Sequence, residues 1–87
     1  MEKSWDDDAW EDYLCWQTQD KKTLKRINKI VNDIDRNRYD GIGKPEPLTG
    51  NLSGYWSRRI DELNRIVYRI KNNRIEIIQC GSHYRDR

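Results

Sequence analysis

Several residue types are scarce in this 87-residue chain, and each scarcity narrows what the protein can be. Its two cysteines, Cys15 and Cys80, stand far apart and cannot form the framework of a disulfide-rich domain, so we expect both to be reduced. No set of cysteine and histidine residues has the spacing of a metal site. No apolar run is long enough for a membrane span or a signal peptide, which favours a cytoplasmic protein.

Apolar residues are also few, at 34% of the chain against 37% charged residues. A chain of this length supports one small core, so we expect a single domain over residues 1–87. Phenylalanine is absent, but four tryptophans and five tyrosines can supply large apolar areas to that core.

Charge is distributed unevenly along the chain. Residues 1–20 contain seven acidic residues and one basic residue, a net −6, and residues 21–87 contain sixteen basic and eight acidic residues, a net +8. A basic portion of this size suggests an anionic partner such as nucleic acid, although an ordinary solvated surface would also explain it. We expect the acidic segment 6–12 to face away from any bound RNA.

The first half of the chain has helical periodicity. Residues 1–5 can form an edge strand, and Asp6 and Asp20 are suited to cap two helices. The apolar face of the first helix is predicted to contain Ala9, Trp10, Tyr13, Leu14 and Gln17. That of the second is predicted to contain Leu24, Ile27, Val31 and Ile34, opposite a basic cluster of Lys22, Lys25, Arg26 and Lys29.

The second half has the pattern of strands. Residues 39–54, with four glycines and two prolines, are predicted to be a long loop. Strands are expected over residues 55–60, 65–71 and 74–80, with a two-residue turn at Asn72-Asn73 because asparagine tolerates positive φ. That turn sets a register in which Arg65 lies opposite Cys80.

The predicted fold is α+β, with two N-terminal helices packed on one face of a twisted antiparallel sheet. The alternation of side chains along the strands places Arg65 and Arg69 on the other face, which the helices leave uncovered. His83 would fall on the wrong face for Arg65 by strict alternation, so its approach to Arg65 requires a kink at Gly81-Ser82.

Four side chains suggest cleavage of a phosphodiester without metal. Glu46 is held between Pro45 and Pro47, each of which fixes its own φ. His83 is the only histidine and titrates near neutrality, which suits proton transfer. With Arg65 to neutralise phosphorane charge, and Tyr84 nearby, one group can remove a 2′-OH proton while another protonates the 5′ oxygen.

Taken together, "GKPEPL", "NLSGYWSRRI", "RIVY", the terminal "HY" and "WEDYLCW" resemble the YoeB/Txe family of bacterial toxins, of the RelE-like superfamily. The resemblance spans residues 5 to 84. It implies a RelE-like fold and a ribosome-dependent mRNA endonuclease that cuts in the A site by 2′-OH attack, with no cofactor. It also implies a homodimer and a YefM/Axe-type antitoxin, whose complex with the toxin binds operator DNA and represses the operon.

The same resemblance implies roles for individual residues. Glu46 corresponds to the general base, Arg65 to the group that stabilises transition-state charge, His83 to the general acid and Tyr84 to an orienting aromatic. The predicted RNA-binding residues are Lys44, Arg58, Arg59 and Arg69. By strand alternation only one of Arg58 and Arg59 should face the site, and Arg59 is favoured.

Two other functions are compatible with the residues alone. The first is a non-catalytic binding module that acts in operator repression with a partner. The second is a ribonuclease that needs no ribosome, since one glutamate and one histidine can form the acid–base pair of such an enzyme.

Overall fold

The computed structural model describes residues 1–82 of the chain. Within these residues, a strand and two helices precede four further strands, with one short 3-10 turn. In chain order the elements are β1 (Glu2–Trp5), α1 (Asp7–Gln19), α2 (Lys21–Asn37), β2 (Glu46–Pro47), η1 (Gly50–Leu52), β3 (Trp56–Arg59), β4 (Arg65–Lys71) and β5 (Arg74–Gly81).

Both helices begin where the sequence predicts. The Asp6 side chain accepts a hydrogen bond from the Ala9 N–H at 2.9 Å and caps α1. Asp20 caps α2 by accepting from the N–H groups of Lys22 and Thr23 at 3.0 and 3.3 Å. These bonds satisfy backbone donors that have no partner inside the first helical turn.

The five strands form one sheet in the order β1-β5-β4-β3-β2. Four of them pair antiparallel, and β1 pairs parallel to β5. The predicted α+β fold is confirmed, with the qualification that β1 makes the sheet mixed. β1 covers the edge of β5 along residues 74–77, where main-chain hydrogen bonds can pair a strand in either direction.

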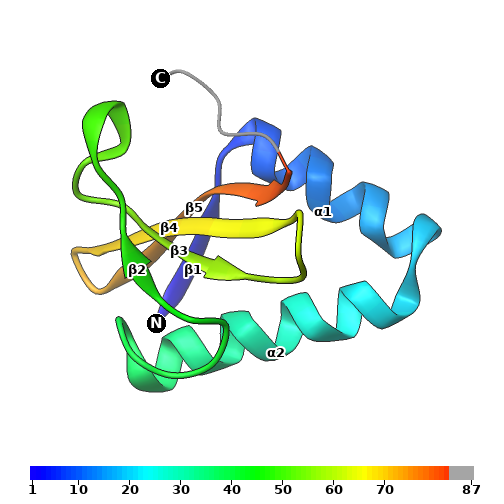
Figure 1. Ribbon diagram of the computed structural model, residues 1–87, viewed down its shortest axis with the longest axis horizontal. Helices are drawn as coiled ribbons and strands as arrows, with labels where there is room; N and C mark the ends of the chain where they lie inside the picture. Colours follow the sequence, from blue (N-terminus) through cyan, green and yellow to red (C-terminus); the bar gives the residue numbers. More distant parts are fainter. Residues whose placement is uncertain (83–87) are drawn as a thin grey trace.

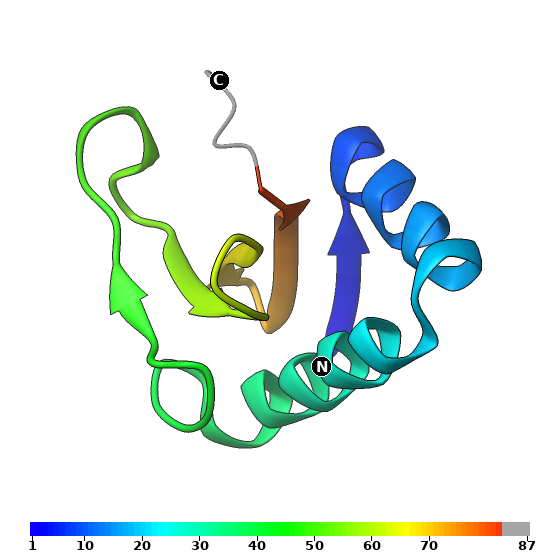
Figure 2. The ribbon, with the colours of Figure 1, turned by 45° about the vertical axis from the view of Figure 1, so that its right-hand side comes forward.

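The core lies between the helices and one face of the sheet (Figures 1 and 2). From α2 it contains the buried residues Ile27, Ile30, Val31 and Ile34, and from the sheet chiefly Ile66, Tyr68, Ile75, Ile77 and Cys80, with Ile60 just after β3. Ile30 belongs to this stripe although the predicted face did not include it. Figure 2 shows α2, in cyan to green, crossing the sheet, and α1, in blue, beside β1.

The predicted face of α1 is partly wrong. Trp10 and Leu14 are 45% and 40% exposed, whereas Trp16 is half-buried and packs against the core with Ala9 and Tyr13. Positions 9, 13 and 16 follow the helical repeat equally well, so the sequence did not determine which of two neighbouring stripes packs inward.

The hairpin of β4 and β5 has the predicted turn, with φ of 54° at Asn72 and 57° at Asn73. Its register agrees with the prediction from Lys71 opposite Arg74 as far as Tyr68 opposite Ile77. A β-bulge then adds Ile78 to β5, and Val67 pairs with Gln79.

Within residues 1–82, no helix is both long enough and apolar enough to span a membrane.

Candidate functional site

The strand registers place three of the predicted site residues on the face of the sheet that the helices leave uncovered. Glu46 lies opposite Ser57, which lies opposite Val67, and Arg59 lies opposite Arg65. Directly opposite residues in neighbouring strands share a face, as do residues two apart in one strand. Glu46, Arg59 and Arg65 therefore belong to one face, brought together from three strands.

The spacing of these residues suits a single phosphodiester and the nucleotides on either side of it. Glu46 on β2 and Arg65 on β4 are separated by the single strand β3. They are also offset by two residues along the strands, so their Cα atoms lie about 12 Å apart. Long side chains extend into this space from both ends. Ser57 and Val67 lie between them, and Gln79 lies beside Val67 on β5; all three are buried and form a floor without net charge.

The segment that carries Glu46 is an edge strand rather than the predicted loop. Glu46 and Pro47 pair with Ser57 and Trp56, and the Leu48 N–H donates to the Tyr55 carbonyl at 2.9 Å. An edge strand tolerates proline because its outward N–H groups need no strand partner. The Glu46 side chain is exposed on this edge.

The guanidinium of Arg65 is held by the turn that precedes it. Its Nη1 donates to the carbonyl oxygens of Asp61 at 2.6 Å, Asn64 at 3.0 Å and Glu62 at 3.3 Å. Within the described residues, Nε and Nη2 make no hydrogen bond, so these donors can bind an anion. The side chain is thus oriented through one nitrogen and available through the others.

The turn itself is ordered by the Asp61 carboxylate. It accepts hydrogen bonds from the N–H of Leu63 at 2.9 Å and from the N–H of Asn64 at 2.8 Å. Burial raises the pKa of Asp61, but the hydrogen bonds from Asn64 and Leu63 and the charge of Arg65 outweigh it, and the net pKa is lowered. Asp61 consequently stays ionised and supports the turn at neutral pH.

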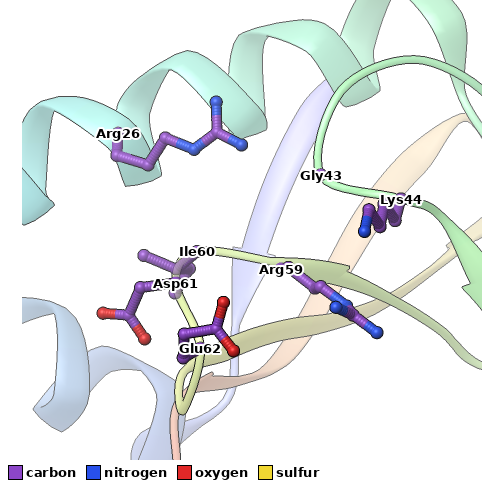
Figure 3. Close-up of a pocket in the computed structure, with 7 residues that line it drawn as sticks. All are labelled: Arg26, Gly43, Lys44, Arg59, Ile60, Asp61 and Glu62. Atoms are coloured by element: carbon purple, nitrogen blue, oxygen red, sulfur yellow. The ribbon is translucent and has the colours of Figure 1, made fainter.

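Positive charge is concentrated beside this turn. Arg59 and Arg65 are directly opposite each other, and like charges in that arrangement are unfavourable unless an anion lies between or beside them. An adjoining pocket of about 310 Å³ is lined by Arg26, Gly43, Lys44, Arg59, Ile60, Asp61 and Glu62. In Figure 3, Lys44 and Arg59 lie on one side of this pocket and the two carboxylates on the other.

The end of β5 reaches the same face, but in a different register from the predicted one. Because of the bulge at Ile78, Arg65 lies opposite Gly81 and not opposite Cys80, which turns into the core. This irregularity, at Ile78, lies three residues before the kink predicted at Gly81-Ser82. It places Gly81 on the face of Arg65.

Two predicted catalytic residues, His83 and Tyr84, lie outside the described residues. Only Ser82 separates His83 from Gly81 in the sequence. Their assignments stay predictions. Within residues 1–82, no three His, Cys, Asp or Glu side chains are grouped to hold a metal ion.

Comparison with known proteins identifies the family. Residues 5–84 match the YoeB-like toxins of bacterial type II toxin–antitoxin systems. The chain belongs to this family. It is 49% identical to Toxin RelK of Mycobacterium tuberculosis over 81 residues, which cover 93% of this chain and 95% of RelK.

Solved structures of YoeB toxins have the same fold. A YoeB/ParE toxin from Agrobacterium tumefaciens is 43% identical with a TM-score of 0.93, covering 97% of this chain and 100% of that one. The Staphylococcus aureus YoeB has been solved in a heterotetrameric YoeB–YefM complex and as a dimer. Both are 46% identical, with TM-scores of 0.90 and 0.89, and each match covers 97% of this chain and 98% of the other.

In this YoeB-like chain, the predicted RNA contact of Arg58 is wrong, because its side chain is completely buried. Arg58 makes an ion pair with Asp33 and donates through Nε to the Tyr68 hydroxyl at 3.2 Å. It also donates to three main-chain carbonyls of the segment before β2, those of Arg38, Asp40 and Ile42. Arg58 therefore fixes the segment that leads to Glu46.

The sequence contained a partial signal for this burial, since Arg58 alternates with the apolar residues Trp56 and Ile60. Asp33 was not predicted at all. It lies on α2, and its carboxylate also accepts from the Ile42 N–H at 3.1 Å and the Asn37 amide at 2.8 Å. Only the packing of α2 against the 38–43 segment brings these residues together.

Arg69 lies on the uncovered face as predicted, and its charge is paired. Its Nε donates to Glu76 at 2.5 Å, and its guanidinium lies 4.9 Å from the centre of the Tyr55 ring. The hydrogen bond from Arg69 lowers the pKa of Glu76, despite the opposing effect of burial. An RNA contact of Arg69 stays a prediction, and Arg69 would make that contact while paired with Glu76.

Proposed function

We propose that this YoeB-like chain is a ribosome-dependent endoribonuclease that cleaves mRNA in the ribosomal A site. The observation that carries the proposal is the common face of Glu46, Arg59 and Arg65, with a neutral floor between the carboxylate and the guanidinium groups. A carboxylate at one end and cations at the other suit a substrate that loses a proton at one oxygen while negative charge grows at phosphorus.

The proposed reaction is a transfer within the RNA chain. Glu46 accepts the proton of the 2′-OH as the 2′ oxygen bonds to the adjacent phosphorus. The bond from phosphorus to the 5′ oxygen breaks, and His83 donates a proton to that oxygen. The products are a 2′,3′-cyclic phosphate and a 5′-hydroxyl end, so no water, metal ion or cofactor takes part in this step.

Arg65 stabilises charge on the phosphorane. Nη1 is already engaged with three carbonyls, which limits the motion of the guanidinium and reduces the entropy lost when it binds phosphate. Arg59 and Lys44 contact neighbouring phosphates, and Tyr84 orients the substrate. Mutual repulsion of Arg59 and Arg65 is relieved when an RNA phosphate binds between them.

We further propose that the protein forms a homodimer and is inhibited by a YefM/Axe-type antitoxin, whose complex with the toxin binds operator DNA. Support comes from the related Staphylococcus aureus YoeB, which forms a dimer and a heterotetrameric complex with YefM. A basic, uncovered sheet face also suits an acidic segment that folds as it binds.

The test is cleavage of a defined mRNA in a purified translation system, with 5′ ends mapped by primer extension. Glu46→Gln and His83→Gln should each lower the cleavage rate by roughly 10²–10⁴-fold. Glu11→Gln removes a carboxylate from the exposed side of α1 and should not change the rate. Wild-type cleavage by both site variants would show that the acid–base assignment is wrong.

Naked mRNA in the same buffer provides the control for ribosome dependence. We expect little or no cutting without ribosomes, and a cyclic phosphate at the new 3′ end when ribosomes are present. Equally fast cutting of naked RNA would favour a free ribonuclease. Binding without any cutting in either condition would favour the non-catalytic module.

A further inference from the structure

The outer edge of β5 changes partner before the strand ends. β1 pairs with β5 only as far as Trp5 opposite Ile77, and the Asp6 N–H donates the next bond, to the Ile77 carbonyl at 3.0 Å. Beyond this point β1 has turned into α1. The last residues of β5 therefore need other partners for the polar groups that face away from β4.

Side chains of α1 supply those partners at Cys80. The Asp12 carboxylate accepts from the Cys80 N–H at 3.2 Å, and the Trp16 indole Nε1 donates to the Cys80 carbonyl at 2.8 Å. Asp12 and Trp16 are four residues apart, so they lie on the same side of α1 and can both bind Cys80. A carboxylate bonded to an N–H is a stronger acceptor than a neutral group.

Cys80 is next to the candidate site. Gly81 follows Cys80, lies opposite Arg65 and is buried. Its carbonyl accepts from the Gln79 amide at 3.0 Å. A Cβ on Gly81 would lie 3.3 Å from an Asp12 carboxylate oxygen, a tight contact that places the carboxylate directly beside Gly81.

We propose that Asp12 and Trp16 are positioning residues, which hold Cys80 by both of its main-chain polar groups and so fix where β5 ends relative to Arg65. The inference rests on the proposed ribonuclease function, because the chain continues from this point to His83. A general acid must start close to the leaving oxygen, and a displacement of about 1 Å can cost on the order of 10²-fold in rate.

The clamp, which is the pair of Asp12 and Trp16 side chains bound to Cys80, includes a residue of the acidic segment 6–12. Asp7 and Asp8 are exposed on the first turn of α1. Asp12, by contrast, points to the end of β5, where its carboxylate accepts from the Cys80 N–H. Its negative charge is directed at a main-chain N–H group. The expectation that the acidic segment 6–12 faces away from bound RNA stays a prediction.

Three variants separate the two halves of the clamp. Trp16→Phe keeps an aromatic ring but loses the donor to the Cys80 carbonyl, and Asp12→Ala loses the acceptor. Asp12→Asn removes the charge but keeps an oxygen that can accept from the Cys80 N–H. Glu11→Gln, on the same helix, is the matched control for loss of charge.

The kinetic measurement is single-turnover cleavage of ribosome-bound mRNA over a range of toxin concentrations. We expect Trp16→Phe and Asp12→Ala to lower the rate at saturation by about 10-fold or more, with the half-saturating concentration within about 2-fold of wild type. Asp12→Asn should restore the rate to within about 3-fold of wild type, since the acceptor remains.

The second measurement does not depend on cleavage. His83 is the only histidine, so the protein gives a single set of imidazole NMR signals. Trp16→Phe should shift these signals and the Cys80 and Gly81 amide signals, and Glu11→Gln should leave them unchanged. If the wild-type protein does not cut mRNA, the proposed function fails while these shifts still test the clamp.

A folded Trp16→Phe protein with wild-type cleavage and unchanged imidazole signals would overturn the proposal. Loss of the rate through weaker ribosome binding alone would overturn it too, because a clamp acts on the placement of groups within the bound complex. If Asp12→Ala does not fold, Trp16→Phe and Asp12→Asn still decide the matter.

Discussion

Replacing Arg58 with methionine removes a guanidinium from a fully buried position while keeping an unbranched apolar side chain there. The change breaks the ion pair with Asp33 and leaves the carbonyl oxygens of Arg38, Asp40 and Ile42 without this donor. Removing one member of a buried ion pair costs about 3–5 kcal/mol.

The position of Asp33 sets where in that range the cost falls. Its side chain is 18% exposed, and it keeps hydrogen bonds from the Ile42 N–H and Asn37, so water and these donors offset part of the loss. We therefore expect the free energy of unfolding to fall by about 3 kcal/mol, at the lower end of the range. For a protein of this size, Tm should fall by roughly 12–24 °C.

The assay is urea unfolding followed by tryptophan fluorescence, with Arg59→Met as the matched control. Arg59 is the next residue, on the opposite face of β3, where it faces Arg65. Its loss should change the free energy of unfolding by less than about 0.5 kcal/mol, or raise it slightly by relieving repulsion. Arg58→Lys keeps the charge but lacks the forked donors and should fall between wild type and Arg58→Met.

A double-mutant cycle identifies the partner. Asp33→Ala combined with Arg58→Met should show a coupling energy of about 1–3 kcal/mol, because the two side chains are in direct contact. Equal stability of Arg58→Met and Arg59→Met would refute the reasoning, since the Arg58 variant also loses a buried ion pair and the hydrogen bonds to three carbonyls. A coupling energy near zero would show that the ion pair is not what Arg58 contributes.

Two further predictions concern titratable groups. Burial raises the pKa of Asp33, but hydrogen bonds from Arg58, the Ile42 N–H and Asn37 outweigh it, so the net pKa is lowered in the folded protein. The stability that ionised Asp33 contributes is present above the unfolded pKa of about 3.9 and is lost as pH falls through the folded pKa. Asp33→Asn should therefore make the fall in stability below pH ~4 less steep. The same pH dependence in Asp33→Asn and wild type, measured by urea unfolding, would count against this. Burial, with a smaller effect of the Asp12 charge, raises the pKa of Cys80 to about 12. A disulfide reagent should label one thiol of the native protein, the exposed Cys15, and both after unfolding; two equally reactive native thiols would contradict the burial of Cys80.

The sequence determined most of the local structure, because local structure depends on short-range chemistry. Asp6 and Asp20 cap their helices, and the Asn72-Asn73 turn sets the hairpin register over its first pairs. The pattern along α2 identified most of its buried stripe. The motif around Glu46 and Arg65 indicated the family, which the comparisons show.

Tertiary structure decided what depends on contacts between distant segments. Alternation could not reveal the bulge at Ile78, which moved Cys80 into the core and set Gly81 opposite Arg65. Arg58 has the composition of an RNA contact, and only the carboxylate of Asp33, 25 residues away, makes its burial possible. The grip of α1 on Cys80 likewise joins residues 64 and 68 positions apart. A side chain's role follows from its partners, and partners far along the chain are chosen by packing and not by the local pattern.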